Sequence, residues 1–270
     1  MKLRIITAII ALPLLILLIA KGSVLLFTLF ICLLSFLGLI EYYQMALPER
    51  RAMSYLIAAA GGILPYFFMN RRWDILVISI TFLTLVISTV LLFNFKDIKQ
   101  VAAEAGIFVF GLIYIPLLLG YLVLCRAGSY GAYWIFLMLC IVMSGDSAAY
   151  FIGCKFGKHK LYPVVSPNKS IEGAIGGLVG SLAGAFIFRM LFFPELPVLL
   201  CGATAVVAGA FGQIGDLFES LIKRSCGVKD SGKIVPGHGG ILDRLDSILF
   251  AAPVIWLASV ILYFMVHNGV

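Results

Sequence analysis

The chain has 270 residues, of which 62% are hydrophobic and 12% are charged, and its formal net charge at pH 7 is +7. Soluble domains are about half apolar and about one quarter charged, so this composition excludes a large soluble domain and indicates a polytopic membrane protein. The mean hydropathy of +1.10 supports the same conclusion. Nucleic acid is not expected as a partner, because the chain has no soluble basic face to bind it.

Apolar runs of about 20 residues are long enough to cross a bilayer as helices. We expect nine such runs to form transmembrane helices: 4–20, 23–45, 54–70, 73–94, 105–124, 131–154, 171–191, 196–223 and 241–266. The third run contains Gly61, Gly62 and Pro65, which weaken a helix. The expected fold class is therefore all-α, with about nine transmembrane helices.

The first apolar run follows Lys2 and Arg4, as the apolar core of a signal peptide does. It ends in Leu-Ile-Ala-Lys-Gly, which is a poor cleavage site, and the next apolar run begins at once. We therefore expect the first run to be retained as a membrane span.

Three glycines of the seventh run, Gly176, Gly180 and Gly184, recur at every fourth position and share one helix face. Small residues allow membrane helices to approach closely. This face is therefore expected to pack against a neighbouring helix.

The distribution of Lys and Arg predicts the orientation of the chain in the membrane. If the nine runs alternate in direction, 14 of the 20 Lys and Arg residues lie on the side of the N-terminus and of the loops 155–170 and 223–240. Cytoplasmic loops carry an excess of Lys and Arg, so these loops and the N-terminus are expected in the cytoplasm. The C-terminus is expected on the opposite side.

Acidic residues lie near the end of the eighth apolar run and near the start of the ninth. Asp216 lies in the eighth run, and Asp243 and Asp246 open the ninth. An Asp or Arg near the centre of a membrane helix costs roughly 2.5–3.5 kcal/mol, so such residues are expected to have a function. Oxygen ligands without Cys or His favour a hard cation such as Mg²⁺. Two alternatives stay open: an internal ion pair with Arg244, or carboxylates that lie at the water interface.

The loop between these acids is basic and rich in glycine. Gly239 and Gly240 allow the backbone to approach a ligand, and their amides can bind anionic oxygens. His238 could bind phosphate or transfer a proton. On a helix, four residues share one face because their spacing follows the helical repeat: Asp216, Glu219, Ser220 and Lys223.

A second polar segment follows the sixth run and opens the seventh. Ser166, Lys169 and Ser170 lie beside Pro167 at the expected start of a helix, where phosphate binds readily. Ser170 or a neighbour can cap that helix, and Glu172 suits its first turn. Asp146 is a further acid at membrane depth, either a site residue or a hydrogen-bond acceptor in helix packing.

Together these residues predict a polar active-site cavity that opens to the cytoplasm, with metal-binding carboxylates at its floor and cations at its mouth. Metal ions and cations of this kind stabilise phosphoryl or nucleotidyl transfer. Because no large soluble domain is present, one substrate is expected to be a lipid.

Several of these motifs resemble the signature of the phosphatidate cytidylyltransferases, also called CDP-diglyceride synthetases. They are Ser220-Leu-Ile-Lys-Arg, Lys229-Asp-Ser-Gly, His238-Gly-Gly-Ile-Leu-Asp-Arg-Leu-Asp246, Gly145-Asp-Ser-Ala-Ala-Tyr-Phe and Ser166-Pro-Asn-Lys-Ser-Ile-Glu-Gly. The resemblance covers about 145–246, and the first five runs match only in being hydrophobic. Ser170 stands where Thr is common, and it keeps the hydroxyl.

The resemblance implies the reaction of CTP with phosphatidate to give CDP-diacylglycerol and pyrophosphate in phospholipid biosynthesis. It also implies Mg²⁺, K⁺ as a second ion, a homodimer, and a place in the bacterial inner membrane. Residues 1–130 would then form a scaffold and dimerisation region of about five helices, and residues 131–270 a catalytic region of about four.

The site residues expected on this basis fall into two groups. Metal ligands and catalytic residues would be Asp216, Asp243 and Asp246, with Lys223, Arg244 and His238 also catalytic. Substrate-binding residues would be Asp146, Ser166, Lys169, Ser170, Ser220, Arg224, Lys229, Asp230, Gly239 and Gly240.

Two other classes of membrane protein remain as alternatives. A CTP-dependent polyprenol or dolichol kinase would transfer the γ-phosphate and release CDP. A cation-coupled transporter would use the acidic residues as an ion or proton relay. A CDP-alcohol phosphotransferase is disfavoured, because the Asp-Gly-x-x-Ala-Arg pattern is missing.

Overall fold

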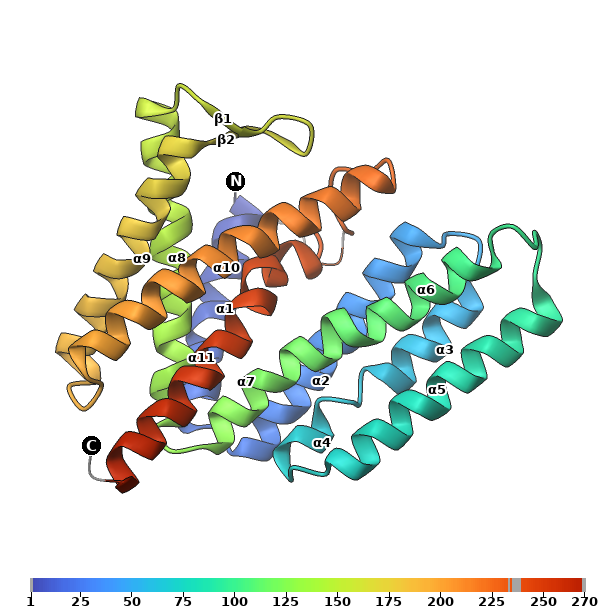
Figure 1. The fold of residues 1–270 in the computed structure, drawn as a ribbon, viewed down its shortest axis with the longest axis horizontal. Helices are drawn as coiled ribbons and strands as arrows, with labels where there is room; N and C mark the ends of the chain where they lie inside the picture. The colour runs from blue at the N-terminus through green and yellow to red at the C-terminus, as the bar shows by residue number, and fades with distance from the viewer. Residues whose placement is uncertain (1, 233, 235–238, 269–270) are drawn as a thin grey trace. The chain divides into compact units, whose positions relative to one another are not determined.

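The structure is a computed structural model that describes residues 2–232, 234 and 239–268, with side chains described from residue 12 to residue 267 within these ranges. Helices dominate, and one small hairpin interrupts them (Figure 1). In chain order the elements are α1 (Lys2–Lys21), α2 (Val24–Ala46), α3 (Arg51–Gly61), α4 (Tyr66–Met69), α5 (Trp73–Asn94), α6 (Val101–Leu112), the π-helical segment η1 (Ile113–Leu117), α7 (Leu118–Ala127), α8 (Gly131–Phe156), β1 (Lys160–Tyr162), β2 (Ser166–Ser170), α9 (Ile171–Phe192), α10 (Val198–Ser225) and α11 (Leu242–Asn268).

Each apolar run predicted from the sequence falls on helix in the structure. Among the described residues, eight helical stretches are long and apolar enough to cross a membrane, the first being α2 and the last α11. α1 is also helical, and its described apolar part is Leu12–Lys21. The prediction of an all-α polytopic membrane protein is thus confirmed, while a membrane-spanning role for α1 stays a prediction.

Glycine and proline interrupt two of these stretches. The third run breaks where expected, because α3 ends at Gly61 and α4 begins only after Pro65. The fifth run contains the π-helical turn η1 around Pro116, which the sequence pattern did not predict. Proline has no N–H to donate to the preceding turn, so the regular helical hydrogen-bond pattern cannot continue through it.

Backbone contacts divide the chain into two compact units, and we describe each by itself. Unit 1 comprises Met1–Leu124 and Asp230–Asp243, and unit 2 comprises Cys125–Lys229 and Arg244–Val270. The functional division into a scaffold region and a catalytic region is a separate question and stays a prediction.

In unit 1, α2 packs against α3 and α6, and α5 packs against α3 and α6 (Figure 1). Two polar contacts fix this arrangement within the apolar packing. The hydroxyl of Tyr43 donates to the carbonyl of Phe108 at 2.8 Å. Arg50 Nη2 pairs with Glu104 Oε2 at 2.8 Å, and both side chains are largely buried.

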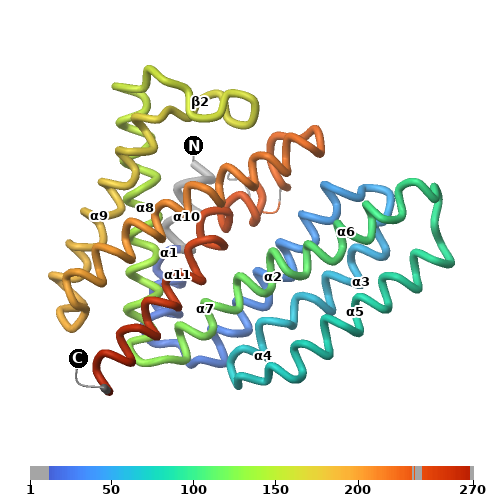
Figure 2. Tube along the Cα trace, in the orientation of Figure 1, coloured from blue at the N-terminus to red at the C-terminus, as the bar shows by residue number. Residues whose placement is uncertain are grey.

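In unit 2, α8, α9 and α10 pack against one another, and the hairpin of β1 and β2 joins α8 to α9 (Figure 2). The predicted glycine face of α9 lies against α8. A Cβ atom at Gly176 would approach Ile152 Cδ1 to 2.5 Å, and one at Gly180 would approach the carbonyl oxygen of Ser144 to 2.7 Å. The prediction that this face packs against a neighbouring helix is therefore confirmed.

Gly180→Ala is expected to destabilise the protein by about 1–3 kcal/mol, because the added methyl group would push α9 away from α8. The midpoint of thermal unfolding in detergent measures this loss. Gly106→Ala is the matched control, since a Cβ at Gly106 would meet nothing within 4 Å. Gly106→Ala should be neutral or slightly stabilising, because Ala favours the helix by about 1 kcal/mol over Gly. Equal midpoints for the two variants would contradict close packing at Gly180.

The hairpin was not predicted, because the segment between α8 and α9 reads as a polar loop in the sequence. β1 and β2 pair antiparallel, with Lys160 opposite Ser170 and Tyr162 opposite Ser166. Pro163 follows Tyr162 in the turn between them, a position at which its fixed φ angle suits a β-turn. β2 runs directly into α9, so the hairpin fixes Lys169 beside the first turn of that helix.

Candidate active site

The acidic residue Asp216 lies on α10 and is paired with a lysine from the hairpin. Lys169 Nζ lies 2.6 Å from Asp216 Oδ2, and the two side chains are 29% and 32% exposed. Lys169 is the last residue of β2 before the N-cap of α9, so the strand-to-helix junction holds its ammonium group near α10. The structure thus brings together two residues that the sequence predicts for the site.

Two further predicted acids lie in the electrostatic neighbourhood of Asp216. Asp146 on α8 interacts with Asp216 and with Lys169, and Asp246 on α11 interacts with Asp216 and with Asp146. Asp246 Oδ1 also accepts the backbone N–H of Ser247 at 2.6 Å. Like charges repel one another, so these carboxylates raise each other's free energy unless positive charge compensates them.

Asp146 also lines a narrow crevice among α8, α9, α10 and α11. Gln213, one helical turn before Asp216, lines the same crevice and donates to the carbonyl of Ala174 at 3.0 Å. Ser247 also lines it. Asp146 therefore lies at a junction of four helices, a position that fits either a site residue or a residue of helix packing.

Lys223 lies almost fully buried on α10 and forms an ion pair with Glu219, one turn earlier on the same helix. It also interacts electrostatically with Asp246. Glu219 and Lys223 therefore lie on one face of α10, as predicted. Lys169 and Lys223 thus each carry a positive charge near one of the predicted acids, Asp216 and Asp246 respectively.

The start of α9 supplies positive potential beside this cluster. The side chain of Ser170 accepts the N–H of Gly173 at 3.1 Å, which confirms the predicted helix cap. Glu172 in the first turn contacts the His159 ring at 2.6 Å, and this contact ties the hairpin to the helix. The N-terminus of a helix attracts anions, so Lys169 and the N-terminus of α9 could together bind a phosphate group. Ser166, at the start of β2, is half-buried.

The third predicted metal ligand, Asp243, belongs to unit 1, where backbone amides surround its carboxylate. The N–H of Ser231 donates to Asp243 Oδ2 at 3.1 Å, and the N–H of Gly240 donates to the same oxygen at 2.9 Å. Gly239 has φ +90°, and a Cβ there would approach Asp243 Oδ2 to 2.9 Å. The amide of Gly240, which we predicted to bind substrate, thus donates to the carboxylate of Asp243 in the first turn of α11 in this structure.

Sequence reasoning missed one acidic residue of unit 1, Glu41 on α2. Its side chain is 3% exposed, and its Oε2 accepts the N–H of Leu242 at 2.9 Å and the hydroxyl of Ser231 at 3.1 Å. The signal was present, because Glu41 is the single acid in an otherwise apolar run, and ionisable residues within membrane spans are functional candidates by default.

The remaining predicted residues are exposed or half-buried, or lie outside the described residues. Arg224 donates to the carbonyls of Val165 and Val228 at 3.4 and 3.3 Å. Lys229, Asp230 and Arg244 are exposed, and Ser220 is half-buried. His238 lies outside the residues that the structure describes.

The oxygen ligands present are compatible with Mg²⁺ that completes its coordination on substrate. In the described ranges, no group of three or more His, Cys, Asp or Glu side chains is arranged to hold a metal ion by itself. Mg²⁺ usually binds one or two protein carboxylates together with water and substrate phosphates, so it does not need such a group. Asp216 and Asp246, both in unit 2, offer two carboxylates of this kind.

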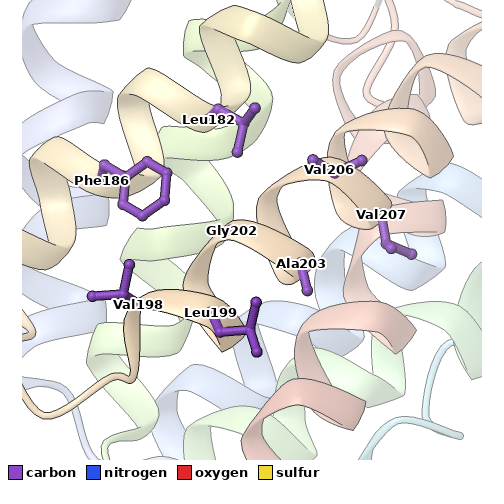
Figure 3. A pocket seen from close by; sticks show the side chains of 8 residues that line it. All are labelled: Leu182, Phe186, Val198, Leu199, Gly202, Ala203, Val206 and Val207. Atoms are coloured by element: carbon purple, nitrogen blue, oxygen red, sulfur yellow. The ribbon is translucent and has the colours of Figure 1, made fainter.

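A hollow of about 480 Å³ opens between α9 and α10 (Figure 3). Its walls are hydrocarbon side chains such as Leu182, Phe186 and Val206, with Gly202 between them. Such a lining can hold an apolar chain but offers no charged or hydrogen-bonding side chain.

Comparison with known proteins shows the family to which the chain belongs. The chain matches the family described as Cytidylyltransferase over residues 2–262. With its apolar helices, this match defines the class as a nucleotidyltransferase built from membrane-spanning helices. The chain belongs to the cytidylyltransferase family.

Three relatives named phosphatidate cytidylyltransferase illustrate the similarity. The protein of Bacillus subtilis (strain 168) is 36% identical over 276 residues, which covers 95% of this chain and 96% of the relative. Those of Staphylococcus saprophyticus and Staphylococcus aureus (strain COL) are 34% and 36% identical, and each comparison covers 94% of this chain and 97% of the relative. The similarity therefore extends well beyond the signature segment, into the first helices.

Proposed function

We propose that this membrane enzyme is a phosphatidate cytidylyltransferase, which transfers the cytidylyl group of CTP to phosphatidate in phospholipid biosynthesis. The observation that carries this proposal is the similarity to phosphatidate cytidylyltransferases over at least 94% of the chain. The cluster of carboxylates and lysines around Asp216 supports it, because charges of both signs are needed to bind and activate phosphate groups.

In the proposed reaction, an oxygen of the phosphatidate phosphate attacks the α-phosphorus of CTP. A new phosphoanhydride bond forms, the bond between the α- and β-phosphates breaks, and pyrophosphate leaves. The nucleophile is already anionic, so the site needs no strong general base. Its task is to align two anions and to balance their charge.

Lys169 and Lys223 are proposed to contact substrate phosphates, and Arg224, Lys229 and Arg244 to attract the nucleotide to the site. Support comes from the position of Lys169 beside the N-terminus of α9, where an anion is favoured twice, by the ammonium group and by the helix end. His238, Ser166, Ser170, Ser220 and Asp230 keep their predicted roles as proposals.

We propose Mg²⁺ as the cofactor, with Asp216 and Asp246 as its protein ligands and K⁺ as a second ion. When bound, the divalent ion neutralises phosphate oxygens and helps to hold the reactants in line. The mutual repulsion of the carboxylates of Asp146, Asp216 and Asp246 supports this proposal, because a bound cation would relieve it.

The proposed setting is the bacterial inner membrane, with the site on the cytoplasmic side and the enzyme acting as a homodimer. The basic loops 155–170 and 223–240 support this orientation, because cytoplasmic loops carry an excess of Lys and Arg. The bilayer supplies phosphatidate, and the cytoplasm supplies CTP.

Purified protein in detergent, given CTP labelled in its cytosine ring together with phosphatidate and Mg²⁺, is expected to form a labelled lipid and one pyrophosphate per lipid. A lipid kinase would release labelled CDP and leave the lipid without cytosine. A transporter would move ions across liposomes in the absence of CTP. Either of these results, without labelled lipid, would overturn the proposal.

A further inference from the structure

A buried hydrogen-bond network in unit 1 links α2 to the segment that opens α11. Glu41 is 3% exposed, although it lies in a helix that is otherwise apolar enough to cross a membrane. Its Oε2 accepts hydrogen bonds from the hydroxyl of Ser231 at 3.1 Å and from the N–H of Leu242 at 2.9 Å. The first N–H groups of a helix lack partners within the helix, so Glu41 satisfies one of them.

The network closes on itself through Ser231 and Asp243. The hydroxyl of Ser231 donates to Glu41 and accepts the N–H of Asp243 at 3.3 Å. The N–H of Ser231 in turn donates to Asp243 Oδ2 at 3.1 Å. One serine therefore joins the carboxylate on α2 to both the backbone and the side chain of Asp243.

Two glycines allow the chain to close around Glu41. A Cβ at Gly240 would approach Glu41 Oε2 to 2.5 Å, and a Cβ at Gly232 would collide with Glu41 Oε1. The backbone at Gly232 and at Gly240 thus passes so close to the carboxylate that only a residue without a side chain fits at either position. The fit indicates a fixed contact rather than a chance approach.

We propose that Glu41 is a positioning residue for cytidylyl transfer, which acts through Ser231 to orient Asp243 and the start of α11. This inference rests on the proposed function. Glu41 acts as a hydrogen-bond acceptor: one oxygen holds the Ser231 hydroxyl and the Leu242 amide in place. It is not proposed to touch substrate.

Two variants of Glu41 separate this role from a general effect on folding. Glu41→Ala removes the acceptor and is expected to lower kcat about 100-fold, because a displacement of about 1 Å in a reacting group can cost that much. The KM for CTP should change by less than about threefold, because positioning acts on the aligned complex rather than on binding. Glu41→Gln keeps one oxygen and should recover kcat to within about tenfold of the unchanged protein.

Tyr43→Phe is the matched control. It removes a buried hydrogen bond from the same helix, 2.8 Å long and made to Phe108, which lies outside the network. It should lower the thermal midpoint and leave kcat unchanged. A fall in kcat as large as that of Glu41→Ala would show a general packing effect and would overturn the proposal.

Amide hydrogen exchange gives a readout that does not depend on activity. Exchange at Ser231, Leu242 and Asp243 is expected to become faster in Glu41→Ala and to stay unchanged in Tyr43→Phe. If the unchanged protein makes no labelled lipid, the proposed function fails, while unaltered exchange in Glu41→Ala would overturn the positioning role separately. A Glu41→Gln variant as inactive as Glu41→Ala would overturn the acceptor role.

Should Glu41→Ala fail to fold, Ser231→Ala decides. This variant deletes only the hydroxyl that links Glu41 to Asp243. It must then show both a lower kcat and faster exchange at Asp243. Values like those of the unchanged protein would overturn the proposal.

Discussion

Asp216→Asn is expected to lower kcat on the order of 100- to 1,000-fold, the size of effect seen when one group that stabilises transition-state charge is lost. Asparagine has nearly the same shape but no negative charge, so it is a poor ligand for Mg²⁺ and a weaker partner for Lys169. The rate of labelled lipid formation at saturating CTP and phosphatidate measures this loss.

The same variant should remain folded. The ion pair of Asp216 with Lys169 is about one third exposed, and partly exposed pairs of this kind contribute roughly 0–1 kcal/mol to stability. The thermal midpoint in detergent should therefore change little. Unchanged activity in Asp216→Asn would remove Asp216 from the proposed metal site.

Glu104→Gln provides the opposite pattern as a control. Glu104 pairs with Arg50 in unit 1 at 2.8 Å, and the two side chains are only 12% and 10% exposed. Loss of this more deeply buried charged partner should destabilise the protein by roughly 1–3 kcal/mol and leave kcat unchanged. Measured together, the two variants distinguish a carboxylate that acts in the reaction from one that acts in folding.

Hydropathy and local chemistry were enough to predict the helices, and the reason is physical. A membrane span must satisfy its own backbone hydrogen bonds, so an apolar run of sufficient length forms a helix whatever it packs against. The break after Gly61 and the cap at Ser170 are likewise local, since each depends on residues within one or two turns. The π-helical turn at Pro116 could not be predicted, because proline can end, kink or distort a helix according to its surroundings.

The sequence predicted which residues belong to the candidate site, but not which of them contact one another. Helical spacing placed Asp216 and Lys223 on one face of α10, yet nothing in that spacing indicates that Lys169, from a distant segment, contacts Asp216. The hairpin that positions Lys169 has only two short strands and a polar sequence, so it leaves no alternating hydrophobic pattern to detect.

Glu41 was missed for a related reason. Its partners, Ser231 and Leu242, lie 190 and 201 positions away along the chain, and its own run contains no second charged residue that would mark a helix face with a function. Only the cost of burying a lone carboxylate in an apolar helix signals it. That cost is met by hydrogen bonds that become visible only when the chain is folded.

Asp243→Asn is expected to lower kcat at least about 100-fold, for two reasons that one experiment can separate. The sequence predicts Asp243 as a metal ligand. In the structure its carboxylate accepts hydrogen bonds from the backbone N–H groups of Ser231 and Gly240. A carboxylate offers about four acceptor positions, so the two roles are compatible. Asparagine keeps one oxygen, but its NH₂ group would face an N–H donor where Asp243 now presents an acceptor.

The dependence of the rate on Mg²⁺ concentration tells the two roles apart. If Asp243 binds metal, Asp243→Asn should raise the half-saturating Mg²⁺ concentration at least about tenfold, the lower end of what altered metal surroundings cost in affinity. Ser231→Ala is the comparison, because it disturbs the same network without removing a carboxylate. It should lower kcat and leave the Mg²⁺ dependence unchanged. If Asp243→Asn also leaves that dependence unchanged, Asp243 acts in positioning alone, and the metal must be held by other carboxylates, of which Asp216 and Asp246 are the proposed pair.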